Sequence, residues 1–289
     1  MSKIWLITGS ANGLGRTLAE AVLESGDRLV ATARNPERLN DLKEKYGEQV
    51  VLFALDVTDS AASKAAIAFA VETFGGLDVL VNNAGYGHMS PFEQVSEEDF
   101  KAQIETNFYG VVNLTRAALP VMRGQRSGYI INVSSVGGRV STPGISAYQA
   151  AKWAVGGFTE VLAKEVASFG VKVIALEPGG MRTNWAQTAI GTKVELLPDY
   201  EPSVGAVNAM LGHIAGKEFG DPVKVSKVIL DLTTRSELPN HLLLGSDALF
   251  VFGLAEAARN KAAADWEPVS RSTDFEGSDI SVFTGGGLE

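Results

Sequence analysis

The sequence predicts an α/β fold, a doubly wound parallel sheet of about seven strands with helices on both of its faces. Short β-rich runs alternate with longer segments whose apolar residues recur at helical spacing. The runs are apolar on both sides, as in "VVLFALD" and "VKVIALEP", which is typical of strands covered by helices on each face. Right-handed crossover connections place the helices in these two layers.

The alternation assigns the elements in order. We expect strands at 3–8, 28–33, 50–56, 77–82, 128–135 and 171–178, and a further strand within 240–248 that runs into a last helix at about 248–264. The helices between the strands are expected at 14–25, 36–45, 60–74, 97–122 and 146–169.

Two regions break the alternation. Residues 184–220 are too long for a simple strand-to-helix connection and predict a lid or substrate-binding insertion. Residues 266–289 are rich in Ser, Thr, Gly and Asp and predict a polar tail without regular structure. We therefore expect a single domain over residues 1–265.

Composition excludes several kinds of partner and chemistry. The formal charge of −9 disfavours nucleic acids and anionic membranes as partners. The absence of cysteine excludes disulfides and thiolate chemistry, and it fits a reducing compartment. The start of the chain lacks the pattern of a secretory signal, and no apolar run is long enough for a membrane span, which predicts a cytoplasmic protein. No His, Asp or Glu group has metal-ligand spacing, so no metal is expected.

A glycine-rich loop follows the first predicted strand and opens the first helix. Its glycines, Gly9, Gly13 and Gly15, allow a tight turn, close approach of backbone N–H groups to a pyrophosphate, and close helix–strand packing. This context favours a dinucleotide-binding loop over a turn without a ligand. Ser10, Asn12 and Leu14 complete the cofactor contacts expected in the loop.

The end of the second strand favours NADP(H), with NAD(H) as the alternative. Ala33 stands where an acid would bind the ribose 2′-hydroxyl, and Arg34 follows, where a cation suits a 2′-phosphate. Ser10 or Arg16 would assist Arg34, unless Arg34 is simply a solvated loop residue. After the third strand, Asp56 either accepts from the adenine amino group beside Val57 or caps the next helix.

With these features placed, the chain resembles the short-chain dehydrogenase/reductase family from residue 3 to about 185. The resemblance rests on "TGSANGLG" at 8–15, "LDVTD" at 55–59, "NNAG" at 82–85, Asn107 in "ETNFYG", "NVSS" at 132–135, "YQAAK" at 148–152 and "PGG" at 178–180. It implies a Rossmann-type NAD(P)-binding domain of the single-domain, NADP-preferring branch, similar to hydroxysteroid and retinol dehydrogenase-like reductases.

The resemblance also implies roles for two further segments. Asn83, Ala84 and Gly85 would border the adenosine part of the cofactor. Around the nicotinamide it implies contacts from Pro178, Gly179, Met181 and Thr183, although a Pro-Gly-Gly run is also an ordinary turn after a strand.

A tyrosine and a lysine one helical turn apart suit acid–base chemistry on a carbonyl group. Tyr148 can donate a proton. Lys152, on the same helical face, is expected together with the charge of an oxidised nicotinamide to lower the tyrosine pKa from its usual value near 10. Either Ser134 or Ser135 can hydrogen-bond the substrate oxygen. The resemblance selects Ser135 and implies that Lys152 also binds the nicotinamide ribose. It further implies that Asn107 holds a water molecule that connects Lys152 to bulk solvent in a proton relay.

These residues predict an NADP(H)-dependent ketone or aldehyde reductase, or alcohol dehydrogenase, acting on a hydrophobic carbonyl or secondary alcohol. The alternatives are a non-catalytic NADP-binding sensor on the same fold and another reaction class, such as epimerisation or dehydration. The side chains that either line an apolar substrate pocket or pack the insertion on the core are Trp153, Trp185, Tyr200, Met210 and Phe219.

The remaining expectations concern the histidines and the oligomer. His88 is a surface residue or touches substrate, whereas His213 and His241 are structural or solvated. The helix at 248–264 has an apolar face that would cover the surface used by tetrameric relatives. This favours a monomer, or a homodimer built on the helices at 97–122 and 146–169.

Overall fold

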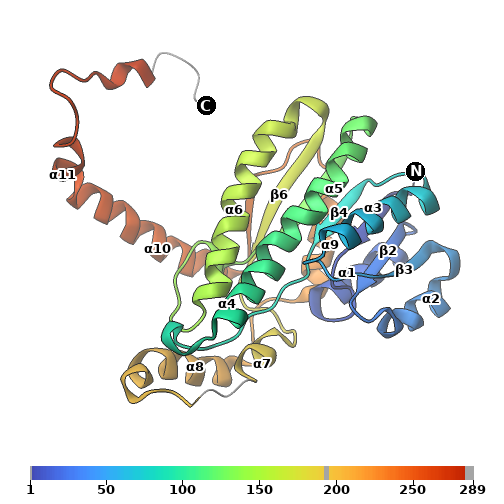
Figure 1. Ribbon diagram of the computed structural model, residues 1–289, viewed down its shortest axis with the longest axis horizontal. Coiled ribbons are helices and arrows are strands. Elements are labelled where there is room, and N and C mark those ends of the chain that lie inside the picture. Colours follow the sequence, from blue (N-terminus) through green and yellow to red (C-terminus); the bar gives the residue numbers. More distant parts are fainter. Residues whose placement is uncertain (1, 192–194, 284–289) are drawn as a thin grey trace.

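The computed structural model describes residues 2–191 and 195–283 and contains a parallel sheet of seven strands (Figure 1). The strands are β1 (Ile4–Ile7), β2 (Arg28–Ala33), β3 (Val50–Ala54), β4 (Val79–Asn82), β5 (Gly128–Val133), β6 (Val171–Pro178) and β7 (His241–Leu244). Their order across the sheet is β3-β2-β1-β4-β5-β6-β7. All neighbouring strands pair in parallel, which confirms the predicted doubly wound sheet.

The direction in which the chain builds the sheet reverses at β1. From β1 the chain adds β2 and β3 on one side, then returns to place β4 on the other side of β1. The connections at the carboxyl ends of β1 and β4 therefore diverge, which leaves a crevice where ligands bind in sheets of this kind.

Helices cover both faces of the sheet. Those that connect its strands are α1 (Gly13–Glu24), α2 (Asn40–Tyr46), α3 (Ser60–Phe74), α4 (Glu97–Ile104), α5 (Gly110–Gln125), α6 (Ser146–Val166) and α9 (Pro222–Leu232). One face carries α1, α2 and α9, and the other carries α3, α5 and α6. Within the described ranges, no helix is both long and apolar enough to cross a bilayer.

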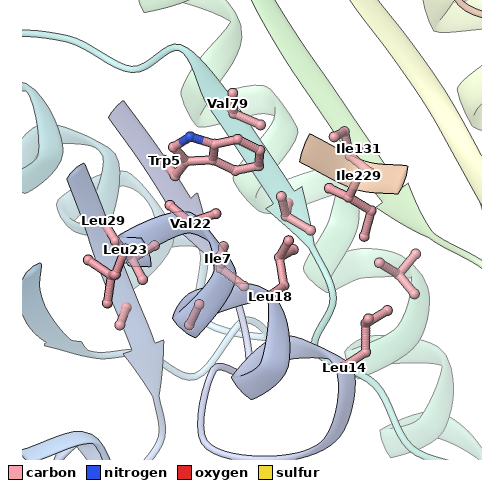
Figure 2. Close-up of a cluster of buried hydrophobic side chains, with 14 of the residues drawn as sticks. Trp5, Ile7, Leu14, Leu18, Val22, Leu23, Leu29, Val79, Ile131 and Ile229 are labelled. Carbon is pink, nitrogen blue, oxygen red and sulfur yellow. The ribbon is translucent and has the colours of Figure 1, made fainter. Parts of the chain in front are cut away.

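The apolar face of α1 explains the larger core (Figure 2). Leu14, Leu18 and Val22 recur every four residues, so they share one stripe of the helix and pack toward Trp5 and Ile7 of β1. Trp5 is fully buried, and its indole N–H donates to the Asp27 carboxylate at 2.9 Å. Burial of each large apolar side chain contributes about 1.5–3 kcal/mol, which fixes β1 and the loop after it.

The insertion at 184–220 is largely helical. Its described part contains α7 (Trp185–Ile190), short turns at Pro198–Tyr200 and Glu201–Gly205, and α8 (Ala206–Ile214). A bridge between Met181 and Gly220 joins the start of this region to its end. Residues 192–194 of the insertion lie outside the described residues.

The C-terminal region differs from both expectations made for it. The last helix, α10 (Ser246–Asp265), projects from the body instead of covering it (Figure 1), and Phe250 and Leu254 on it are 67% and 59% exposed. The predicted polar tail is partly ordered, with α11 (Glu267–Arg271) and a turn at Ile280–Phe283. Residues 284–289 of that predicted tail lie outside the described residues.

Candidate active site

A cleft of about 1300 Å³ opens at the carboxyl ends of the central strands, where the winding of the sheet reverses. The predicted site residues that line it are Gly9, Asn12, Gly13, Leu14, Arg34, Asp56, Val57, Asn83, Ala84, Gly85, Ser135, Tyr148, Lys152, Pro178, Gly179, Met181 and Thr183. The fold thus gathers most of the residues singled out in the sequence, which come from six separate connections.

The glycine-rich loop forms one end of the cleft. Gly9 and Gly13 have φ angles of +69° and +52°, a left-handed conformation that other residues rarely adopt, so the loop can turn sharply into α1. Asn12, Gly13 and Leu14 line the cleft, which places the positive end of the α1 dipole at its surface.

Ser10 and Gly15, both predicted to touch the cofactor, lie behind the loop instead. Ser10 is fully buried, and its hydroxyl donates to the Ile7 carbonyl at 2.9 Å. A Cβ atom on Gly15 would come within 3.0 Å of the Gly9 carbonyl carbon, so this glycine permits close packing of helix against loop. Both residues shape the loop from beneath.

Two arginines stand at the end of the cleft next to β2. Arg34 follows the strand directly, is exposed and lines the cleft, as predicted. Arg38 also lines it and donates to the Asn12 side chain at 2.6 Å. Arg16, considered as a helper of Arg34, instead pairs with Asp41 and with Glu20.

Asp56 lies after β3 and lines the cleft with a lowered pKa. Hydrogen bonds from the backbone and hydroxyl of Thr58, at 3.0 and 2.7 Å, stabilise its carboxylate. It is Asp59 that caps α3, by accepting from the backbone N–H groups of Ala61 and Ala62. The cap alternative for Asp56 is therefore wrong, and its carboxylate is left facing the cleft.

The "NNAG" segment joins β4 to the glycine loop. The Asn83 amide donates to the Thr8 carbonyl at 2.8 Å, and Asn83 and Ala84 donate their backbone N–H groups to the Thr8 hydroxyl. Asn82 donates to Asn132 at 2.8 Å in the middle of the sheet. These bonds hold the two walls of the crevice at a fixed separation.

Tyr148, Lys152 and Ser135 meet at the other end of the cleft. Tyr148 and Lys152 lie in the first two turns of α6 and are only 8% and 4% exposed. Ser135 follows β5 and forms a hydrogen bond with the Tyr148 phenol. The hydroxyl of Ser134 donates instead to the Lys152 carbonyl at 3.2 Å, so the geometry favours Ser135 as the substrate-facing serine.

In the protein by itself the Tyr148 pKa is raised, whereas Lys152 and an oxidised nicotinamide together were expected to lower it. Burial raises the pKa of Tyr148 to about 12, and its hydrogen bond with Ser135 offsets this only in part. Burial also lowers the pKa of Lys152 to about 8. The Lys152 ammonium donates to the Val133 carbonyl at 2.8 Å and lies 5.6 Å from the centre of the Tyr148 ring.

Asn107 interrupts the helix that was predicted to be continuous over 97–122. It lies in a π-helical turn, Glu105–Tyr109, between α4 and α5. Its side-chain amide donates to the carbonyls of Gln103 and Tyr86, each at 2.8 Å, which supports the widened turn. Within the described chain, its buried Oδ1 atom has no hydrogen-bond partner. A Cβ atom on Gly85 would lie 2.5 Å from this oxygen and 3.5 Å from the Lys152 Nζ atom.

The insertion supplies an apolar wall beside Tyr148. Trp185 packs against the Tyr148 ring with centroids 5.1 Å apart, and Trp185, Met210, Leu211 and Ile214 line the cleft. The other aromatic candidates lie elsewhere. Phe219 is 77% exposed, Tyr200 donates to Glu93, and Trp153 packs beneath Arg259 of α10.

The histidines take structural positions. His88 contacts Asp99 at 2.8 Å outside the cleft lining, and His213 bonds to the Ala209 carbonyl at 2.7 Å. His241 pairs with the fully buried Glu177 at 2.7 Å. Among the described residues, no cluster of three or more His, Asp or Glu could hold a metal ion.

Four charged residues of the cleft lining were missed in the sequence, namely Arg38, Glu105, Glu218 and Asp247. Arg38 had a usable signal, since it lies four residues after Arg34 in the same basic segment. Glu218 and Asp247 carry no local motif. They reach the cleft only because the insertion and the α10 start fold back onto the turn after β6.

Comparison with known proteins identifies the family of this chain. The family model described as short chain dehydrogenase matches residues 3–193. Oxidoreductase BOA17 of Botryotinia fuckeliana is 46% identical over 271 residues, covering 93% of this chain and 98% of its own.

Solved structures show the same likeness in three dimensions. A short-chain dehydrogenase from Streptomyces avermitilis is 38% identical with a TM-score of 0.87, covering 95% of this chain and all of its own. A structure of ElxO with NADP bound is 30% identical with a TM-score of 0.70, covering 84% of this chain and 96% of its own. The cleft described above therefore lies in a fold that holds a nicotinamide dinucleotide in a similar protein.

Proposed function

Because the chain belongs to the short-chain dehydrogenase family and is an oxidoreductase acting on CH–OH groups, we propose that it interconverts a hydrophobic ketone or aldehyde and the corresponding alcohol, with NADP(H) as its preferred cofactor. The observation that carries the proposal is the buried Tyr148–Ser135 hydrogen bond beside Lys152, at the end of a cleft that begins at a glycine-rich loop.

The residues of the cleft fit a dinucleotide phosphate. A side chain at Gly9 would be crowded, since its Cβ would lie 3.2 Å from the Ala84 Cα, and the φ angle of +69° favours glycine there, so backbone borders the cleft at this point. Gly13 at the start of α1 would hold the pyrophosphate, and Arg34 with Arg38 would pair with a 2′-phosphate. Lys152 would bind the nicotinamide ribose. When bound, the cofactor supplies or accepts the hydride.

Tyr148 would transfer the proton that accompanies the hydride. With its pKa raised to about 12, the phenol is protonated at neutral pH, so it can donate to a carbonyl oxygen. Ser135 would hydrogen-bond the same oxygen and hold it near the phenol as charge develops. The free Asn107 Oδ1 atom and the Lys152 ammonium, on either side of Gly85, are suited to hold a water that replaces the proton.

The apolar wall of the cleft supports the proposed substrate class. Trp185, Met210, Leu211 and Ile214 favour an aromatic or alicyclic ketone over a small charged metabolite.

The proposal also covers the domain organisation, the oligomeric state and the cellular compartment of the enzyme. We expect one catalytic domain over residues 1–265, a monomer or homodimer, and action in the cytoplasm on a small molecule. The absence of cysteine and the formal charge of −9 support the compartment and disfavour nucleic acid and anionic membrane partners.

The direct test follows oxidation of NADPH and of NADH with a panel of ketones, aldehydes and steroids. We expect turnover with apolar ketones, and turnover at least about a hundredfold lower in Tyr148→Phe with unchanged NADPH affinity, because the phenol is needed only for proton transfer. Near-normal turnover in Tyr148→Phe would refute the assignment of the proton donor. NADPH binding without turnover of any compound would favour the sensor alternative.

A further inference from the structure

The start of α10 lies against the turn that follows β6. Strand β7 pairs with β6 in a register that sets Leu244 beside Pro178, and the chain then enters α10 through Gly245, whose φ is +113°. This brings Asp247, in the first turn of α10, to the lining of the cleft. The family match ends at residue 193, so Asp247 lies outside the part of the chain that carries the recognised motifs.

Asp247 and its strand hold the Gly179–Gly180 backbone from two sides. The Gly180 N–H donates to the Asp247 Oδ2 atom at 2.8 Å, and the Gly179 N–H donates to the Leu244 carbonyl at 2.9 Å. A Cβ atom on Gly179 would lie 2.5 Å from the Asp247 carboxyl carbon. The carboxylate therefore occupies the space that a side chain at Gly179 would need.

The contact with Gly180 is a charge-assisted hydrogen bond to a half-buried carboxylate. Within the described chain, the second carboxylate oxygen of Asp247, Oδ1, is buried and without a hydrogen-bond partner. A bond to an ionised, shielded acceptor is stronger than an ordinary backbone bond. The acid also lies in the first turn of a helix, where the dipole stabilises negative charge.

We propose that Asp247 is a positioning residue that fixes the turn bordering the nicotinamide and so sets the affinity for the cofactor. The inference rests on the proposed function, because it needs Pro178 and Gly179 beside the nicotinamide. Asp247 touches backbone rather than reacting atoms, so its loss should weaken cofactor binding and leave the Tyr148 acid–base step intact.

The test measures the NADPH dissociation constant of the full-length protein by fluorescence, together with the pH profile of turnover at saturating NADPH. We expect Asp247→Ala to weaken binding about tenfold, the scale of one lost charge-assisted bond. Asp247→Asn keeps an acceptor oxygen and should stay within about threefold of the parent. Ser246→Ala, the exposed neighbour on the same turn, serves as the matched control and should bind normally. The pH profile should not move in any of the three.

A second pair of variants keeps the test decisive if Asp247→Ala unfolds. Gly179→Ala should weaken NADPH binding because its methyl group overlaps the carboxylate. The loss should be smaller when Gly179→Ala is made in the Asp247→Asn background, where the uncharged amide can turn aside. Equal losses in both backgrounds, or parental affinity in Asp247→Ala, would overturn the proposal. If the unaltered protein binds neither NADPH nor NADH, the proposed function fails and this inference fails with it.

Discussion

At the scale of single residues, the proposed preference for NADP(H) rests on the arginines that follow β2. Arg34 and Arg38 both line the cleft, whereas Arg16 is held by Asp41 and Glu20. We therefore propose that the first two cations pair with the 2′-phosphate of NADPH, a group that NADH does not offer.

The double variant Arg34→Ala/Arg38→Ala should lose NADPH affinity by about tenfold or more while NADH affinity stays nearly constant. Each lost pairing with a phosphate removes a charge-assisted hydrogen bond, although exposure to solvent reduces its contribution. Titration of the protein with each cofactor checks this. Arg116→Ala serves as the control, because Arg116 lines a separate groove between α5 and α6 and not the cleft. A parallel loss for NADH would show that the arginines support the loop and not the phosphate.

Residue types were easier to predict than their environments. The glycine loop, Tyr148, Lys152 and Ser135 lie in short local motifs, so their roles follow from types and spacing. The direction of the Tyr148 pKa shift does not, because it depends on how completely Trp185 and the insertion bury the phenol. Ser10 was misplaced for a similar reason, since the sequence does not show which side of the loop its hydroxyl faces.

At the scale of elements, a side-chain contact between Glu177 and His241 links the neighbouring strands β6 and β7. Glu177 of β6 is fully buried and contacts His241 of β7 at 2.7 Å, while Arg139 approaches Glu177 and Glu160 approaches His241, each at 3.6 Å. The Glu177 hydrogen bond raises the pKa of His241, and burial and the Arg139 charge act against this rise.

The raised His241 pKa predicts a dependence of stability on pH. Protonated His241 is stabilised by folding, so its contribution is fully present below its ordinary pKa of about 6.5 and is lost as pH rises through the higher folded value. We expect the difference in free energy of unfolding between the parent and His241→Gln to shrink between about pH 6 and pH 9. Urea titrations at both limits measure it. A difference that is constant or grows with pH would contradict the pairing.

Elements whose pattern is local were predicted, and those that depend on distant contacts were not. All seven strands were placed within a few residues, because each is a compact apolar run. The π-helical turn at Asn107 was missed, since its widened geometry is supported by the Tyr86 carbonyl in a different connection. Asp247 was missed because it meets Gly180 across 67 residues, through the pairing of β6 with β7.

At the scale of the whole molecule, the C-terminal helices divide into an attached part and a projecting part. The start of α10 is fixed by Asp247 and by Ala248, which is fully buried. Further along, Phe252 lies under Arg139 at 4.9 Å and Arg259 lies over Trp153 at 5.4 Å. From residue 257 to 281 every residue is exposed, and Figure 1 shows this segment extending away from the sheet.

Two truncations should therefore differ sharply in their effects. Ending the chain after Asp265 removes no described side chain that is buried, since residues 266–281 are all exposed, so the free energy of unfolding should change by less than about 0.5 kcal/mol and NADPH affinity should stay constant. Ending it after Gly245 removes the Asp247 bond and the buried Ala248, and it should weaken both cofactor binding and stability. Thermal unfolding and NADPH titration of the two shortened proteins, beside the full chain, make the comparison. A large loss of stability in the protein that ends at Asp265 would mean that the projecting segment packs against something in solution. In that case the oligomeric state of the full chain, measured by light scattering, should change with the same truncation.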